Sequence, residues 1–145
     1  MLKGINKLLT GDLLKALCDM GHGDMLAIVD ANYPAETMAA RLIKYPGISA
    51  TELLSAIVEV FPLDHIVEAP ALLMEMETAD RAFGMDEPAI WKDFAEIIEK
   101  EYGSEKKIGK VSRQEYYDLS KAGCLIVQTG EGRLYGDIIL IKGVL

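Results

Sequence analysis

Apolar residues recur along the chain at two spacings, and each spacing predicts a different kind of element. Apolar positions three and four residues apart predict amphipathic helices, here over residues 13–20, 50–61, 89–102 and 113–122. Short apolar runs bounded by glycine, proline or polar residues predict strands, here over residues 25–30, 71–76, 108–111, 124–129 and 137–142. The two kinds of element therefore alternate along most of the chain.

Residues suited to helix ends support these boundaries. Ser49-Ala50-Thr51-Glu52 and Ser112-Arg113-Gln114-Glu115 both have a serine followed three residues later by glutamate, which is the pattern of a capping box. Thr10 or Asp12 suits the start of the first helix, and Gly21 suits its end. These caps predict where three of the four helices begin.

Alternating helices and strands are typical of an α/β fold. We expect a single domain over residues 1–145, with a central mixed sheet flanked by helices. A chain of 145 residues has the length of one compact domain, and it contains no internal repeat and no linker long enough to separate two domains.

The net charge of the chain argues against two classes of binding partner, nucleic acids and membranes. It has 15 basic and 23 acidic residues, a net charge of −8. Such a surface repels phosphate backbones and anionic lipids, so we expect neither nucleic acid nor a membrane as partner. No apolar run has the roughly 18 residues of a membrane span. The hydrophobic share of 50% and a mean hydropathy of +0.16 indicate contacts between subunits in addition to a core.

The cysteines and the N-terminus suggest a compartment. Cys18 and Cys124 are far apart in the sequence and lie among apolar neighbours, so we expect two buried, reduced thiols. The first residues lack the apolar stretch and cleavage site of a signal peptide. Both features predict a cytoplasmic protein.

A first candidate site lies around the strand predicted at 25–30. His22 stands between two glycines just before this strand, in Gly21-His22-Gly23-Asp24, and Asp30 lies at its carboxyl end, where ligands of open α/β sheets usually bind. If the fold brings them together, they form an acid–base pair in which the carboxylate orients the imidazole. The alternative is a turn histidine and a strand-end aspartate with no shared role.

Further polar groups cluster near other element ends. Arg113 and Tyr117 lie four residues apart on one face of a predicted helix, and Tyr135-Gly136-Asp137 precedes the last strand. Each group also has a simpler interpretation, as a surface contact or a turn. The sequence has no Cys/His metal cluster, phosphate-binding glycine loop or hydrolase elbow. The combined set of side chains suits a polyol held by many hydrogen bonds.

Five segments occur in an order that is more specific than any one of them. They are Met1-Leu2-Lys3-Gly4-Ile5, Gly21-His22-Gly23-Asp24, Asp30-Ala31-Asn32-Tyr33-Pro34, Arg113 with Tyr116-Tyr117, and residues 129–140 from Thr129-Gly130-Glu131 to Tyr135-Gly136-Asp137-Ile138-Ile139-Leu140. With these segments the chain resembles the L-fucose mutarotase / D-ribose pyranase family over essentially its whole length, and most closely the fucose branch.

The resemblance implies a cofactor-free mutarotase that interconverts the anomers of a free monosaccharide, with L-fucose the expected sugar. It implies a sugar site that contains His22, Asp30, Arg113, Tyr117, Tyr135 and Asp137. From the chemistry of anomer exchange we assign His22, Asp30 and Tyr135 as catalytic residues: His22 is the main proton carrier, Asp30 orients it or binds a sugar hydroxyl, and Tyr135 is the second proton carrier. Arg113, Tyr117 and Asp137 are the expected sugar-binding residues. It also implies a ring-shaped homo-oligomer with the site near a subunit boundary. A D-ribose pyranase and a non-catalytic sugar-binding or transport-accessory protein are the alternatives.

The chain departs from the family at one position of the last motif. Members usually have Asn after Tyr-Gly, whereas this chain has Asp137. The two side chains have nearly the same shape, but an ionised aspartate accepts hydrogen bonds and cannot donate one. We expect Asp137 to accept a hydrogen bond from the sugar.

Overall fold

The computed structural model describes residues 2–82 and 84–145. In these residues, twelve helices and strands follow one another along the chain. They are α1 (Gly11–Asp19), β1 (Met25–Val29), α2 (Ala35–Met38), β2 (Leu42–Tyr45), α3 (Ala50–Val58), β3 (Ala71–Met74), α4 (Thr78–Ala82), α5 (Ile90–Tyr102), β4 (Ile108–Val111), α6 (Arg113–Ala122), β5 (Leu125–Thr129) and β6 (Ile138–Ile141).

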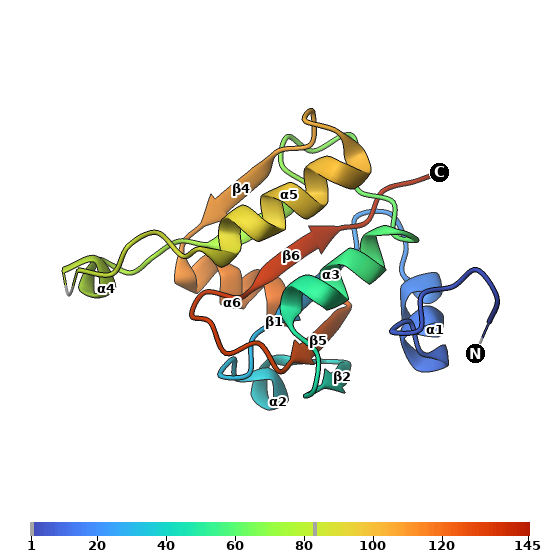
Figure 1. Cartoon of the computed structure of the whole chain (residues 1–145), viewed down its shortest axis with the longest axis horizontal. Coiled ribbons are helices and arrows are strands. Elements are labelled where there is room, and N and C mark those ends of the chain that lie inside the picture. Colours follow the sequence, from blue (N-terminus) through green and yellow to red (C-terminus); the bar gives the residue numbers. More distant parts are fainter. Residues whose placement is uncertain (1, 83) are drawn as a thin grey trace.

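The strands form one mixed sheet in the order β2-β5-β1-β6-β3-β4 (Figure 1). β1 pairs in parallel with β5, β5 with β2, and β3 with β4. β6 runs antiparallel to both of its neighbours, β1 and β3. The residues just before β6 therefore meet the residues just after β1 at the same edge of the sheet, which we call the carboxyl edge.

Helices cover both faces of this sheet. α3 and α5 pack against each other on one face, while α6 and α2 pack against the other (Figure 1). The central strand β1 is buried from Leu26 to Val29, because it has a neighbour on each side and helices on both faces. The edge strands β2 and β4 are only partly buried. This arrangement confirms the predicted α/β class with a mixed sheet flanked by helices.

The helix caps follow the predicted chemistry. The Thr10 hydroxyl accepts a hydrogen bond from the Leu13 N–H at the start of α1. At α3, Ser49 and Glu52 form the complete capping box. At α6, the Ser112 hydroxyl accepts from the Glu115 N–H at 3.2 Å. The α6 cap matters for function, because it fixes the first turn of the helix that begins with Arg113.

Three short elements were not predicted from the sequence. β2 is a four-residue edge strand and α2 is a single helical turn. α4 has no buried residue and lies in an arm that projects from the sheet (Figure 1). The buried thiols are a further correction, because Cys18 is exposed on α1 and Cys124 is half-buried, although both are free. In the described residues, no helix is long and apolar enough to span a membrane.

Candidate functional site

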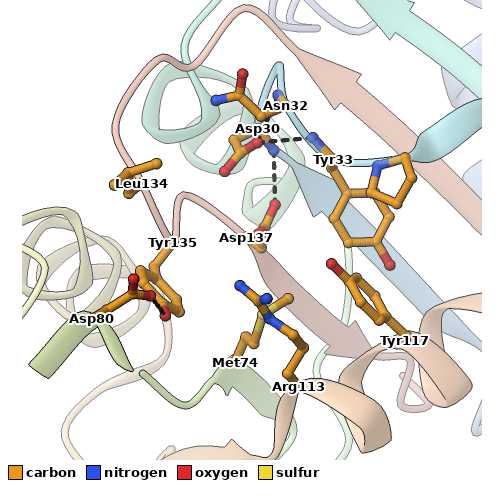
Figure 2. A pocket seen from close by; sticks show the side chains of 11 residues that line it. Asp30, Asn32, Tyr33, Met74, Asp80, Arg113, Tyr117, Leu134, Tyr135 and Asp137 are labelled. Carbon is orange, nitrogen blue, oxygen red and sulfur yellow. Dashed lines mark hydrogen bonds between the residues drawn. The ribbon is translucent and has the colours of Figure 1, made fainter. Parts of the chain in front are cut away.

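A polar cavity of about 250 Å³ opens at the carboxyl edge of the sheet (Figure 2). Five of the six side chains predicted from the sequence as site residues line it: Asp30, Arg113, Tyr117, Tyr135 and Asp137. They come from the end of β1, the start of α6 and the loop before β6. The reversed direction of β6 is what brings Tyr135 and Asp137 to the same edge as Asp30.

Asp30 and Asp137 form the floor of the cavity. Asp30 directly follows β1, and its Oδ1 accepts hydrogen bonds from the backbone N–H groups of Asn32 at 2.8 Å and Tyr33 at 3.0 Å. The backbone N–H of Asp30 donates to Oδ1 of Asp137 at 2.8 Å (Figure 2). Each aspartate is only 5% exposed. These bonds fix the turn after β1 and tie it to the start of β6.

The surroundings raise the pKa values of both aspartates. Burial is the main cause for Asp137, the neighbouring Asp30 charge adds to it, and the pKa of Asp137 rises to about 8. Burial also raises the pKa of Asp30, although its backbone hydrogen bonds oppose this change. Two carboxyl groups this close disfavour a double negative charge, so the pair retains a proton near neutral pH.

One wall of the cavity comes from α6. Arg113 lies in its first turn and Tyr117 one turn later, so both face the cavity, as the spacing predicts (Figure 2). The Arg113 Nε is 3.4 Å from a carboxylate oxygen of Glu77. The Tyr117 ring packs edge-on against Tyr33, with ring centres 5.5 Å apart. The hydroxyl of Tyr33 in turn hydrogen-bonds Ser120 of α6. These contacts provide a cation and aromatic surface beside the two aspartates.

Tyr135 forms the opposite wall. Its backbone has a φ of 59°, which is unusual for a residue with a side chain and places strain in this loop. The Tyr135 hydroxyl donates to the Asp80 carboxylate and accepts from the Glu77 N–H at 2.9 Å. The indole N–H of Trp91 donates to the Tyr135 carbonyl at 3.2 Å. Burial and Asp80 raise the pKa of Tyr135, so the phenol keeps its proton at neutral pH.

His22 lies at the other end of β1, away from the cavity of its own chain. His22 precedes β1 and Asp30 follows β1. At about 3.3 Å per residue, the strand and its flanking residues separate the two side chains by roughly 20 Å. The glycine turn is held by the Gly23 N–H, which donates to the Lys142 carbonyl at 2.8 Å, and Gly23 has a φ of 84°. Within one chain, His22 and Asp30 therefore do not form the expected pair.

The carboxylate that contacts His22 is Asp64. The His22 Nε2 is 3.2 Å from an Asp64 oxygen. The Asp64 side chain is only 4% exposed, whereas that of His22 is 42% exposed. The Ile66 N–H donates to the other Asp64 oxygen at 2.8 Å and helps to lower the pKa of Asp64, so this carboxylate is ionised. A buried carboxylate thus orients an accessible imidazole at the end of β1 opposite the cavity.

Sequence reasoning missed Asp64, Asp80 and Glu77. Asp64 lies in Pro62-Leu63-Asp64-His65, where nothing in the sequence links it to His22, 42 residues away. Asp80 lies in the short helix α4 and Glu77 directly precedes it. This helix has no apolar face, so the sequence shows no periodicity there. In residues 2–82 and 84–145, no group of three or more His, Cys, Asp or Glu side chains could hold a metal ion.

Comparison with known proteins identifies the family. The sequence profile of the RbsD / FucU transport protein family matches residues 3–145. The chain belongs to this family. It is 38% identical to the human fucose mutarotase, with the alignment covering 99% of this chain and 94% of the relative. It is also 38% identical to the L-fucose mutarotase of Actinobacillus pleuropneumoniae, with 99% and 97% covered.

Solved structures of RbsD / FucU family members show the same fold. The fucose mutarotase of Streptococcus pneumoniae, solved in complex with L-fucose, superposes with a TM-score of 0.91 at 40% identity over 99% of both chains. The RbsD protein of Bacillus subtilis, complexed with D-ribose, gives a TM-score of 0.71 at 25% identity over 100% of this chain and 99% of that chain. The higher similarity to the fucose protein confirms the family and the predicted branch.

Proposed function

We propose that this protein is a mutarotase that interconverts the anomers of L-fucose. The observation that carries the proposal is the cavity at the carboxyl edge, where three aspartates, an arginine and three tyrosines line about 250 Å³. This volume is below the roughly 300–1,000 Å³ of pockets for drug-sized ligands and suits one monosaccharide. The L-fucose complex of the similar Streptococcus pneumoniae protein supports the choice of sugar.

Anomer exchange needs proton transfer at two oxygens of the sugar. A base takes the proton of the anomeric hydroxyl while an acid protonates the ring oxygen, the ring opens to the aldehyde, and closure on the other carbonyl face reverses both transfers. Positioned acids and bases accelerate such steps by about 10²–10⁴-fold. No step of this sequence uses a cofactor.

The side chains suit distinct roles in this reaction. His22 is the main proton carrier, since imidazole exchanges protons near neutral pH, and Asp64 orients it through the 3.2 Å contact. Tyr135 is the second proton carrier, linked to Asp80 through its hydroxyl. Asp30 binds a sugar hydroxyl, and Arg113 and Tyr117 hold further hydroxyls and the ring face.

His22 takes part in this reaction only if it enters the cavity of another subunit. The cavity and His22 lie at opposite ends of β1, so the contact joins two different surfaces, and such head-to-tail contacts generate rings when the rotation closes. Exposed apolar side chains support contacts at both surfaces, with Ile66 and Val67 just after Asp64 and Leu134 at the cavity. The proposed assembly is therefore a ring-shaped homo-oligomer.

The proposed location is the cytoplasm. Cys18 and Cys124 are free, and Cys18 is exposed on α1. An exposed free thiol suits a reducing compartment better than an oxidising one.

NMR exchange spectroscopy on free sugars tests the activity. The rate of exchange between the α and β anomers of L-fucose is measured with and without protein, and the same is done for the pyranose and furanose forms of D-ribose. Faster exchange of L-fucose anomers supports the proposal. Acceleration confined to D-ribose would replace it with a pyranase, and sugar binding without acceleration would replace it with a sugar-binding protein.

A further inference from the structure

The carboxyl group of Asp137 has one oxygen engaged by the fold and one oxygen left for a ligand. Oδ1 accepts the Asp30 N–H at 2.8 Å. In the described part of the chain the hydrogen bond to Oδ1 is the only one that the Asp137 side chain forms, so Oδ2 is left without a partner there, and Asp137 lines the cavity. The two oxygens are thus distinguished, and any proton on this group belongs on Oδ2, because Oδ1 faces a donor.

The neighbours of the Asp137 carboxyl favour its neutral form. It is buried, and the opposing charge that acts on it, that of Arg113, is shared with Glu77. The titratable and charged groups around it or lining the same cavity are Asp30 from the end of β1, Tyr33 from the next loop, Arg113, Tyr116 and Tyr117 from α6, Asp80 from α4, and Glu131 and Tyr135 from its own loop. Glu131 is itself paired with Arg133 at 3.0 Å.

We propose that Asp137 binds the sugar as a neutral carboxylic acid, whose Oδ2–H donates a hydrogen bond to a sugar oxygen, in place of the acceptor role expected from the sequence, so that ionisation of this one group weakens sugar binding. The inference rests on the proposed function, because it assumes that a sugar occupies this cavity. A carboxylate at the same place accepts only, and it meets the lone pairs of any sugar oxygen that carries no proton, such as the ring oxygen.

The balance of charges supports the same protonation state. Burial and the Asp30 carboxylate raise the pKa of Asp137 to about 8, and Arg113 opposes this increase. At pH 7 most of the group is therefore protonated, and at pH 9 most of it is ionised. The binding of a sugar that needs the proton falls about tenfold for each pH unit above the pKa.

The variant Asp137→Asn isolates this effect. An asparagine whose Oδ1 accepts the Asp30 N–H presents its NH₂ group at the place of Oδ2, so it donates at every pH. A matched control is Asp118→Asn, which removes the same charge from an exposed position of α6, where Gln114 donates to Asp118.

The dissociation constant of L-fucose is measured by ligand-observed NMR from pH 6 to pH 9.5 for the native protein and both variants. We expect about tenfold weaker binding at pH 9 than at pH 7 for the native protein and for Asp118→Asn, and a profile that is flat between pH 7 and pH 9 for Asp137→Asn. A flat native profile, or the same loss in Asp137→Asn, would overturn the inference.

A second measurement separates this inference from the proposed function. The ¹³Cγ shift of Asp137, assigned by its loss in Asp137→Asn, is followed with pH in the sugar-free protein. We expect a titration step in this chemical shift near pH 8. A step in the ordinary pH range of aspartates would overturn the proposal that Asp137 is a neutral acid, independently of any result on sugar binding. A transition near pH 8 without L-fucose binding at any pH overturns the proposed function, and with it the sugar-donor role of Asp137.

Discussion

The buried carboxyl of Asp137 makes the stability of the fold depend on pH, and Asp137→Asn removes this dependence. The pKa of the side chain is raised from 3.8 to about 8, first by burial and then by Asp30. Between these values the unfolded chain is ionised while the folded chain keeps the proton. The native state then binds one proton more than the unfolded state, so the free energy of unfolding falls as the pH rises.

The size of the effect follows from this one proton. Each pH unit between the two pKa values lowers the contribution of Asp137 to the free energy of unfolding by about 1.4 kcal/mol. Between pH 5 and pH 7 this amounts to about 3 kcal/mol, a large part of the roughly 5–15 kcal/mol that stabilises a typical domain. Asparagine keeps the hydrogen bond from the Asp30 N–H and has no titrating proton.

The assay compares urea denaturation of the native protein and Asp137→Asn at pH 5, 6 and 7, at equal protein concentrations because the subunits are expected to associate. We expect the variant to gain stability over the native protein with each step, by about 3 kcal/mol in total. Other titrating groups contribute to both proteins and largely cancel. A difference that stays constant with pH would show that Asp137 is ionised in the folded state, and would refute the reasoning.

Three further predictions concern His22, assembly and a tight loop. His22→Ala should reduce the rate of L-fucose anomer exchange by about 100-fold or more, with an unchanged circular dichroism spectrum. The control His65→Ala, at an exposed loop position, should leave this rate unchanged. Equal exchange rates for His22→Ala and the native protein would remove His22 from the mechanism. Light scattering at micromolar concentration should give a mass several times the 15.9 kDa of one chain, and a monomer with full activity would contradict a shared site. Gly130→Ala should lower the free energy of unfolding by about 3 kcal/mol, because a Cβ at this position would lie 2.1 Å from the Pro46 carbonyl oxygen. Gly132→Ala is the control: a Cβ there has nothing within 4 Å, so the free energy of unfolding should change by less than about 0.5 kcal/mol. Similar urea midpoints for the two variants would contradict the expected clash.

The fold was predictable where one element carries its own strong signal. β1, β3, β5 and β6 appear as apolar runs because they are buried in the sheet, and the Ser49 and Ser112 caps mark real helix starts. The edge strands β2 and β4 are equally little buried, and only β4 was predicted, so edge exposure alone does not explain why β2 was missed. α4 was not predicted because a helix without buried residues has no apolar periodicity.

The candidate site was predictable in its composition and less so in its geometry. Asp30, Arg113 and Asp137 were expected near element ends, and the reversed β6 brings them together at one edge. Within one chain His22 and Asp30 do not pair, for a physical reason that the sequence already contains. A residue that precedes a strand and a residue that follows it lie at opposite ends, so no turn in one chain can join them. The Asp64 contact depends on long-range packing, which no local pattern encodes.

The opposite positions of His22 and the cavity lead to a test of the shared site by subunit mixing. His22→Ala leaves a subunit with an intact cavity, and Arg113→Ala leaves one with an intact His22, so each variant alone is inactive if both residues act in one site. In a head-to-tail ring each site takes His22 from one subunit and the cavity from the next, so random mixing of equal amounts restores about one quarter of the sites. Coexpression of the two variants, followed by purification of the mixed ring, should therefore recover about one quarter of the native rate of L-fucose exchange. If each chain builds its site alone, every subunit in the mixture carries one defect and no activity returns.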